Sequence, residues 1–174
     1  MSKLDQDIEE DIYQLLSRSF MRLDSSDTLL MRKFGLTLTQ SWALVHLGDA
    51  EGRSLSELAR LLICDKSNVT SIVDKLEAEK LAVRQRGKAG DRRYTRVVLT
   101  KQGQRLRQAV IAAREYMIRE RLSNLNEHEL RQLHNTLQKL SGLLTEQYQV
   151  GEESRIIEQA FEQSNAITTM ANES

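Results

Sequence analysis

Positively charged side chains are concentrated in one short stretch of a chain whose charges cancel only in total. The 174 residues hold 25 Lys and Arg against 25 Asp and Glu. Residues 84–100, RQRGKAGDRRYTRVVLT, contain two glycines, which let a backbone turn tightly and approach another molecule closely. This pattern suits contact with a polyanion over a limited area. Against the single acid Asp91, the basic residues are Arg84, Arg86, Lys88, Arg92, Arg93 and Arg96.

A second set of polar side chains lies just before this stretch, in residues 65–80. An apolar stripe at Val69, Ile72, Val73 and Leu76 predicts a helix with one face in the core. The opposite face offers small polar and basic groups that suit base edges and phosphates in a major groove. These groups belong to Lys66, Ser67, Asn68, Thr70, Ser71 and Lys75.

The elements that would position both sets follow from caps and periodicity. Ser54 with Glu57 is a capping box, and it opens a short helix that ends near Leu62. Asp65 can cap the next helix across a tight turn, which gives a helix-turn-helix. Alternation of apolar and polar residues on both sides of the Gly-containing loop predicts a β-hairpin. A helix-turn-helix followed at once by a basic hairpin is a winged helix. The alternating apolar positions are Leu81, Val83, Thr95, Val97 and Leu99.

Longer helices flank this region on both sides. Apolar residues three and four apart predict a helix from 5 to about 33, and Thr39 is the expected N-cap of the helix that follows it. Thr100 should cap a helix that ends near 122, and Asn126 one that ends near 148. The leucines of the last helix average 3.5 residues apart, a spacing typical of a seam between packed helices. Such a self-complementary seam would most simply serve homodimerisation.

The predicted fold class is therefore mostly α with a small β-hairpin wing. Residues 1–35 and 101–150 would form a helical domain from the N- and C-terminal helices. Residues 36–100 would form a winged helix-turn-helix DNA-binding domain, and residues 151–174 an acidic, weakly structured tail.

Several segments of this pattern resemble the MarR (multiple antibiotic resistance regulator) family of bacterial and archaeal transcription factors. The most specific is the hairpin signature, Asp-x-Arg followed after five residues by Leu-Thr, here Asp91, Arg93, Leu99 and Thr100. The segments LTLTQSWAL and SNVTSIVDKLEAEKL, the latter followed by Arg84, are also similar to the family, and the resemblance covers roughly residues 8–148. Two positions where the family favours glycine carry other residues, namely Ile63 and Lys80.

The resemblance implies an obligate homodimer that binds a pseudo-palindromic operator in double-stranded DNA. Its first and last helices, within residues 1–35 and 101–150, would interlock as the dimerisation domain. The residues expected in this dimer contact are Ile8, Ile12, Leu15, Leu133, Leu137, Leu140 and Leu144. The recognition helix, 65–80, would lie in the major groove, and the wing, 84–96, would reach the minor groove. Arg93 would enter that groove with Asp91 orienting its guanidinium. A repressor released by a small-molecule effector is expected, with the effector and its binding residues unknown.

Other interpretations remain open. The leucine seam could serve a scaffold protein that binds other proteins. Cys64 could make the chain a redox-sensing regulator, although its position favours packing inward. The spacing of His128 and His134 does not place two ligands on one helical face, so we expect no metal site.

No motif indicates an enzyme or a cofactor. A single cysteine, no apolar stretch near the length of a membrane span, and no secretion signal favour a cytoplasmic protein without membrane contact.

Overall fold

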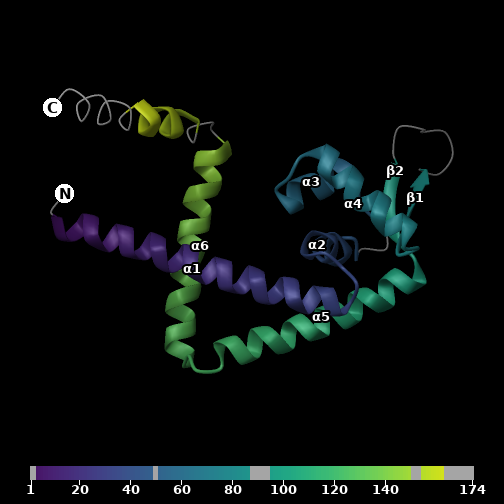
Figure 1. Ribbon diagram of the computed structural model, residues 1–174, viewed down its shortest axis with the longest axis horizontal. Helices are drawn as coiled ribbons and strands as arrows, with labels where there is room; N and C mark the ends of the chain where they lie inside the picture. Colours follow the sequence, from purple (N-terminus) through teal and green to yellow (C-terminus); the bar gives the residue numbers. More distant parts are fainter. Residues whose placement is uncertain (1–2, 49–50, 87–94, 150–153, 163–174) are drawn as a thin grey trace. The chain divides into compact units, whose positions relative to one another are not determined.

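A computed structural model describes residues 3–48, 51–86, 95–149 and 154–162 (Figure 1). The chain divides into two compact units, Met1–Met117 and Ile118–Ser174. Within the described residues the fold is mostly α with one antiparallel hairpin, as the sequence predicts. No helix among them combines the length and apolar character that a membrane crossing requires.

The first unit opens with a long helix that turns sharply into a short one. α1 (Lys3–Lys33) is followed by Gly35, whose φ of 72° places it in the left-handed region that glycine adopts without strain. α2 (Leu38–His46) begins at Thr37, whose hydroxyl accepts the N–H of Gln40. The Gln40 side chain accepts the N–H of Thr37 in return, 2.7 Å away. The expected cap at Thr39 is therefore wrong, because the residue three positions after Thr37 is the one that completes a capping box.

The predicted helix-turn-helix is present. α3 (Leu55–Leu62) starts with the capping box of Ser54 and Glu57, in which the Glu57 carboxylate accepts the Ser54 N–H at 2.7 Å. α4 (Lys66–Ala78) packs against α3 and α2. Asp65 occupies its N-cap position, but its side chain makes no capping hydrogen bond. The turn between the helices therefore depends on the backbone of Ile63, which has a φ of 50°.

The hairpin follows α4 directly. β1 (Ala82–Arg86) pairs with β2 (Thr95–Leu99), with Ala82 opposite Leu99 and Arg84 opposite Val97. The predicted hairpin is present, and Val97 and Leu99 of β2 face the core. On β1 the buried residue is Ala82, whereas Val83 is 40% exposed. Since Ala82 pairs with Leu99, the pairing puts these two residues on the same face.

Helix α5 (Lys101–Leu122) starts against the base of the hairpin. The Thr100 hydroxyl accepts the N–H of Gly103 at 3.0 Å and donates to the carbonyl of Lys80 at 2.7 Å. A Cβ at Gly103 would lie 1.9 Å from the carbonyl oxygen of Leu81. Glycine is therefore required for the first turn of α5 to approach the hairpin this closely.

One apolar core joins the elements of the first unit. It takes residues from each helix and from the hairpin, and no buried polar side-chain atom in the described structure lacks a hydrogen-bond partner. The apolar stripe of α4 supplies Val69, Val73 and Leu76, all without exposed surface, while Ile72 is half-buried. This burial fixes which face of α4 points outward.

The second unit contains α6 (Glu127–Gln149) and a shorter helix over residues 154–162. Asn126 and Glu129 form the expected capping box at the start of α6. The leucines of the predicted seam are accessible in the single chain, with Leu133 and Leu137 each 42% exposed and Leu144 56% exposed.

Candidate nucleic-acid interface

Helix α4 presents the polar face that the sequence predicts. Because Val69, Val73 and Leu76 are buried, the residues between them point away from the core. Five of the six predicted contact residues are exposed, and the sixth, Thr70, is half-buried. The exposed five are Lys66, Ser67, Asn68, Ser71 and Lys75.

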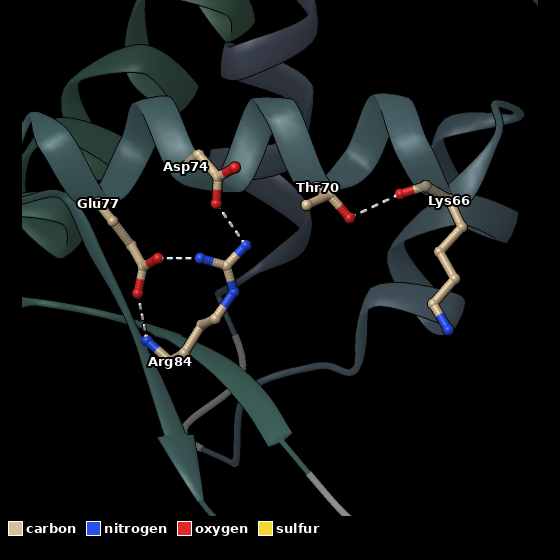
Figure 2. A network of polar contacts seen from close by, with 5 residues as sticks. All are labelled: Lys66, Thr70, Asp74, Glu77 and Arg84. Atoms are coloured by element: carbon tan, nitrogen blue, oxygen red, sulfur yellow. Dashed lines mark hydrogen bonds and ion pairs between the residues drawn. The ribbon is translucent and has the colours of Figure 1, made fainter.

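The hydroxyl of Thr70 is already engaged within the helix. It donates to the carbonyl of Lys66, one turn earlier, at 2.9 Å (Figure 2). Ser and Thr commonly bond back to this carbonyl when they lie inside a helix. The Thr70 hydroxyl oxygen keeps its capacity to accept a hydrogen bond, whereas its proton is used.

Arg84 is held by two carboxylates of α4 rather than standing free on the hairpin. Its guanidinium bonds Asp74 at 2.7 Å and also pairs with Glu77, and its backbone N–H donates to Glu77 at 2.7 Å (Figure 2). The Arg84 side chain is 27% exposed. This network ties the first strand of the wing to α4. The sequence pattern placed Arg84 among the predicted DNA contacts because it does not reveal these two carboxylate partners.

Arg96 has a comparable role on the second strand. Its guanidinium donates to the carbonyl of Gly52 at 2.8 Å, and the adjacent Arg53 pairs with Val97 as an isolated bridge. Hydrogen bonds from Ser54 lower the pKa of Glu57, and the charges of Arg96 and Arg53 lower it further. Part of the positive charge of the wing therefore holds the wing onto the loop before α3.

The tip of the wing lies outside the described residues. This applies to four of the predicted contact residues, Lys88, Asp91, Arg92 and Arg93, whose roles stay predictions. Arg86 closes β1 and is the last described residue before the tip.

The residues considered for redox or metal chemistry are placed as follows. Cys64 is half-buried against the apolar core, which agrees with the inward packing that its position favours. In the described part of the chain, no three His, Cys, Asp or Glu side chains gather as a metal site would require.

Sequence reasoning missed an aromatic and basic cluster between α2 and α5. The guanidinium carbon of Arg114 lies 3.7 Å from the ring centre of Trp42, within the range of a cation–π contact. The ring of His46 stacks on Trp42 with centres 6.3 Å apart. Burial lowers the pKa of His46, and the charges of Arg53 and Arg114 lower it further. The spacing of Trp42 and His46, four residues apart on one helix, was the available signal.

Comparison with known proteins gives relatives that fit a winged helix in which α4 turns a polar face outward. The sequence matches the model of the MarR family over residues 34–93. It is 30% identical over 141 residues to the HTH-type transcriptional repressor MdtR of Bacillus subtilis (strain 168), a match that covers 81% of this chain and 90% of MdtR. The chain belongs to the MarR family.

Solved structures extend the MarR likeness to most of the fold. CouR from Rhodococcus jostii RHA1, solved with p-coumaroyl-CoA bound, is 27% identical with a TM-score of 0.65, over 76% of this chain and 92% of CouR. The S. aureus MepR–DNA complex has a TM-score of 0.68 at 23% identity, over 75% of this chain and 96% of MepR, and it supports the fold. MdtR is a transcriptional regulator, and as a member of the MarR family this chain belongs to the same class of protein.

Proposed function

We propose that this MarR-family regulator is a dimeric, sequence-specific repressor that a small-molecule effector releases from double-stranded DNA. The observation that carries the proposal is the outward polar face of α4 beside a basic hairpin. MdtR is named as a repressor, and MepR has been solved with DNA, which supports the same role here.

The recognition helix would enter the major groove. Its first turn carries Lys66, Ser67 and Asn68, all exposed, and recognition helices contact base edges mainly through their N-terminal residues. Ser71 and Lys75 continue this face toward the helix end. Side chains of this kind donate to phosphates and can bond to bases.

The wing would reach the neighbouring minor groove. Arg92 and Arg93 are the side chains we assign to that contact, with Asp91 orienting Arg93 and with Arg86 and Lys88 near phosphates. A narrow minor groove has an enhanced negative potential that attracts arginine. Since Arg84 and Arg96 are engaged by other parts of the protein, we expect them to brace the wing instead.

Dimerisation would pair the helices at the two ends of the chain. Residues 1–35 and 101–150 would form this domain, and residues 36–100 the DNA-binding domain. Apolar side chains on α1 and α6 are exposed in the single chain, including Ile8 at 59% and Leu144 at 56%, which favours cover by a second copy. Two recognition helices would then read half-sites about one helical turn apart.

Release by an effector would follow from unequal binding to two shapes of the dimer. CouR has been solved with an aromatic acyl-CoA, and in this chain the half-exposed Trp42 with Arg114 above it suits an aromatic or anionic ligand. A DNA-binding regulator works where the chromosome lies, so we expect the cytoplasm of a bacterial cell.

The test is fluorescence-anisotropy binding to duplex DNA across a series of salt concentrations. Wild type should bind tightly and lose affinity steeply as salt rises, because phosphate contacts release counterions. The Arg92→Ala/Arg93→Ala variant should bind more weakly with a shallower slope.

Lys101→Ala is the matched control, because Lys101 is exposed at the start of α5 and removal of its charge should cost less affinity than Arg93→Ala. If Lys101→Ala and Arg93→Ala lost equal affinity for DNA, insertion of the wing into the minor groove would be contradicted. Absence of salt-dependent binding by wild type would contradict the proposed function as a whole.

A further inference from the structure

Three helices of the first unit end at a residue in the left-handed region, and one of the three residues is glycine. The residues are Gly35 after α1, Ile63 after α3 and Lys80 after α4, with φ values of 72°, 50° and 59°. In each case the N–H of the next residue bonds to the carbonyl five residues before it. This arrangement closes helices efficiently, and it usually uses glycine or asparagine because a Cβ is crowded there.

Ile63 is the most costly of the three residues at its position. A branched Cβ makes a left-handed conformation a genuine outlier, whereas the unbranched Cβ of Lys80 is less crowded. The side chain of Ile63 is also 84% exposed, so burial in the protein offsets little of this strain. Cys64 points into the core, which leaves Ile63 to point outward. Strained residues of this kind cluster at functional sites.

The position of Ile63 puts its side chain within reach of the proposed DNA site. Lys66, the first residue of the recognition helix, is three residues away, so their Cα atoms are at most about 11 Å apart. A major groove is about 12 Å wide. The exposed basic residues Arg60 and Lys66 flank Ile63 in sequence and suit the phosphates of the groove edge.

We infer that Ile63 is a specificity-determining residue, whose side chain contacts the C5-methyl group of a thymine at the major-groove edge beside the start of α4. The inference rests on the proposed function and adds to it an apolar contact. Thymine offers the methyl group that an apolar side chain can recognise in the major groove.

The experiment starts with duplexes selected from a random library by the wild-type protein. Anisotropy then gives the affinity of wild type, Ile63→Asn and Ile63→Leu for a selected duplex and for copies in which each thymine is replaced in turn by deoxyuridine. Asn tolerates the left-handed region and removes the apolar group, whereas Leu keeps an apolar group without the branched Cβ. Lys80→Asn is the matched control, because it also places asparagine at a left-handed position, at the other end of α4.

Wild type should lose affinity when one particular thymine lacks its methyl group, and Ile63→Asn should be insensitive at that position. Ile63→Asn should bind the intact duplex roughly tenfold more weakly, as expected for loss of one good base contact. Ile63→Leu should stay close to wild type, and Lys80→Asn should keep the wild-type pattern of thymine sensitivity. Thermal unfolding should show that Ile63→Asn is at least as stable as wild type, since it relieves strain.

The outcomes separate the two proposals. If wild type binds no duplex, the proposed function fails and takes the inference with it. If wild type binds a selected duplex and Ile63→Asn shows the same affinity and the same thymine sensitivity, the inference alone is overturned. Weaker binding by Ile63→Asn with unchanged thymine sensitivity would also overturn it, because the contact would not be with a methyl group.

Discussion

At the scale of single residues, a basic side chain in the wing can either neutralise a phosphate or neutralise the protein's own carboxylates. Arg84 does the second, since Asp74 and Glu77 both bond its guanidinium. Lys66 begins α4 with its side chain exposed. The two residues should therefore respond differently to the same loss of charge.

We expect Arg84→Gln to weaken binding to a specific duplex without a change in the dependence on salt. Its loss leaves the wing less firmly attached to α4 but removes no phosphate contact. Lys66→Gln should reduce the slope of log affinity against log salt by about 0.9, the value for one phosphate contact. Anisotropy titrations at several salt concentrations measure both slopes. If Arg84→Gln reduced the slope of log affinity against log salt, Arg84 would have to contact a DNA phosphate after all.

His46 should make stability depend on pH. Burial, Arg53 and Arg114 lower its folded pKa from 6.5, so the unfolded chain binds a proton more readily. The stability this contributes is complete above pH 6.5 and is lost as the pH falls through the folded pKa. We expect the thermal midpoint of wild type to fall between about pH 7 and pH 5 more than that of His46→Gln. If the thermal midpoints of wild type and His46→Gln fell equally with pH, groups other than His46 would cause the pH dependence of stability.

The contacts that single residues make were the part of the site that was hardest to predict from the sequence. The outward face of α4 followed from the spacing of its apolar stripe, because the helical period fixes which residues share a face. The pairing of Arg84 with Asp74 and Glu77 could not be predicted in this way, because it depends on how β1 lies against α4. The cap at Thr37 could have been found, since Gln40 follows it by three residues and Trp42 follows Thr39.

At the scale of elements, the wing is fixed at its base by close backbone contact as well as by ion pairs. Gly103 brings α5 against the carbonyl of Leu81, and Thr100 bonds to Lys80. Gly52 has a similar role on the other side, where a Cβ would lie 2.4 Å from the carbonyl oxygen of Val97. Ala82, which pairs with Leu99 at this base, has no exposed surface.

We expect Gly103→Ala to destabilise the protein by about 1–3 kcal/mol, the usual cost of overpacking a close contact. The added methyl group would force α5 away from Leu81. Chemical denaturation followed by circular dichroism measures the change. Gly142→Ala is the control, because it lies inside α6 with no atom within 4 Å of the new Cβ. It should stabilise by about 0.5–1 kcal/mol. A neutral Gly103→Ala would mean that the contact can relax.

At the scale of the whole molecule, α1 and α6 both expose large apolar side chains. Those on α6 include leucines three and four residues apart in the sequence. The elements could be predicted because period and caps are local properties. Cover of these faces by a second copy stays a prediction, because it depends on a second chain.

We expect Leu137→Glu to convert a dimer into monomers, because it places a charge in the proposed apolar seam. Sedimentation velocity measures the change. Gln138→Glu adds the same charge at the neighbouring exposed position and should leave the dimer intact. A dimer that persists in Leu137→Glu would show that the seam lies elsewhere.

The start of α5 has a mechanical consequence. α5 is 22 residues long, about 33 Å, and after Gly103 it contains neither glycine nor proline up to Leu122. A rod of that length moves about 3 Å at one end for every 5° that it tilts about the other. Because the first turn of α5 packs against Leu81 at the root of the wing, a change in the direction of α5 would displace the hairpin with it.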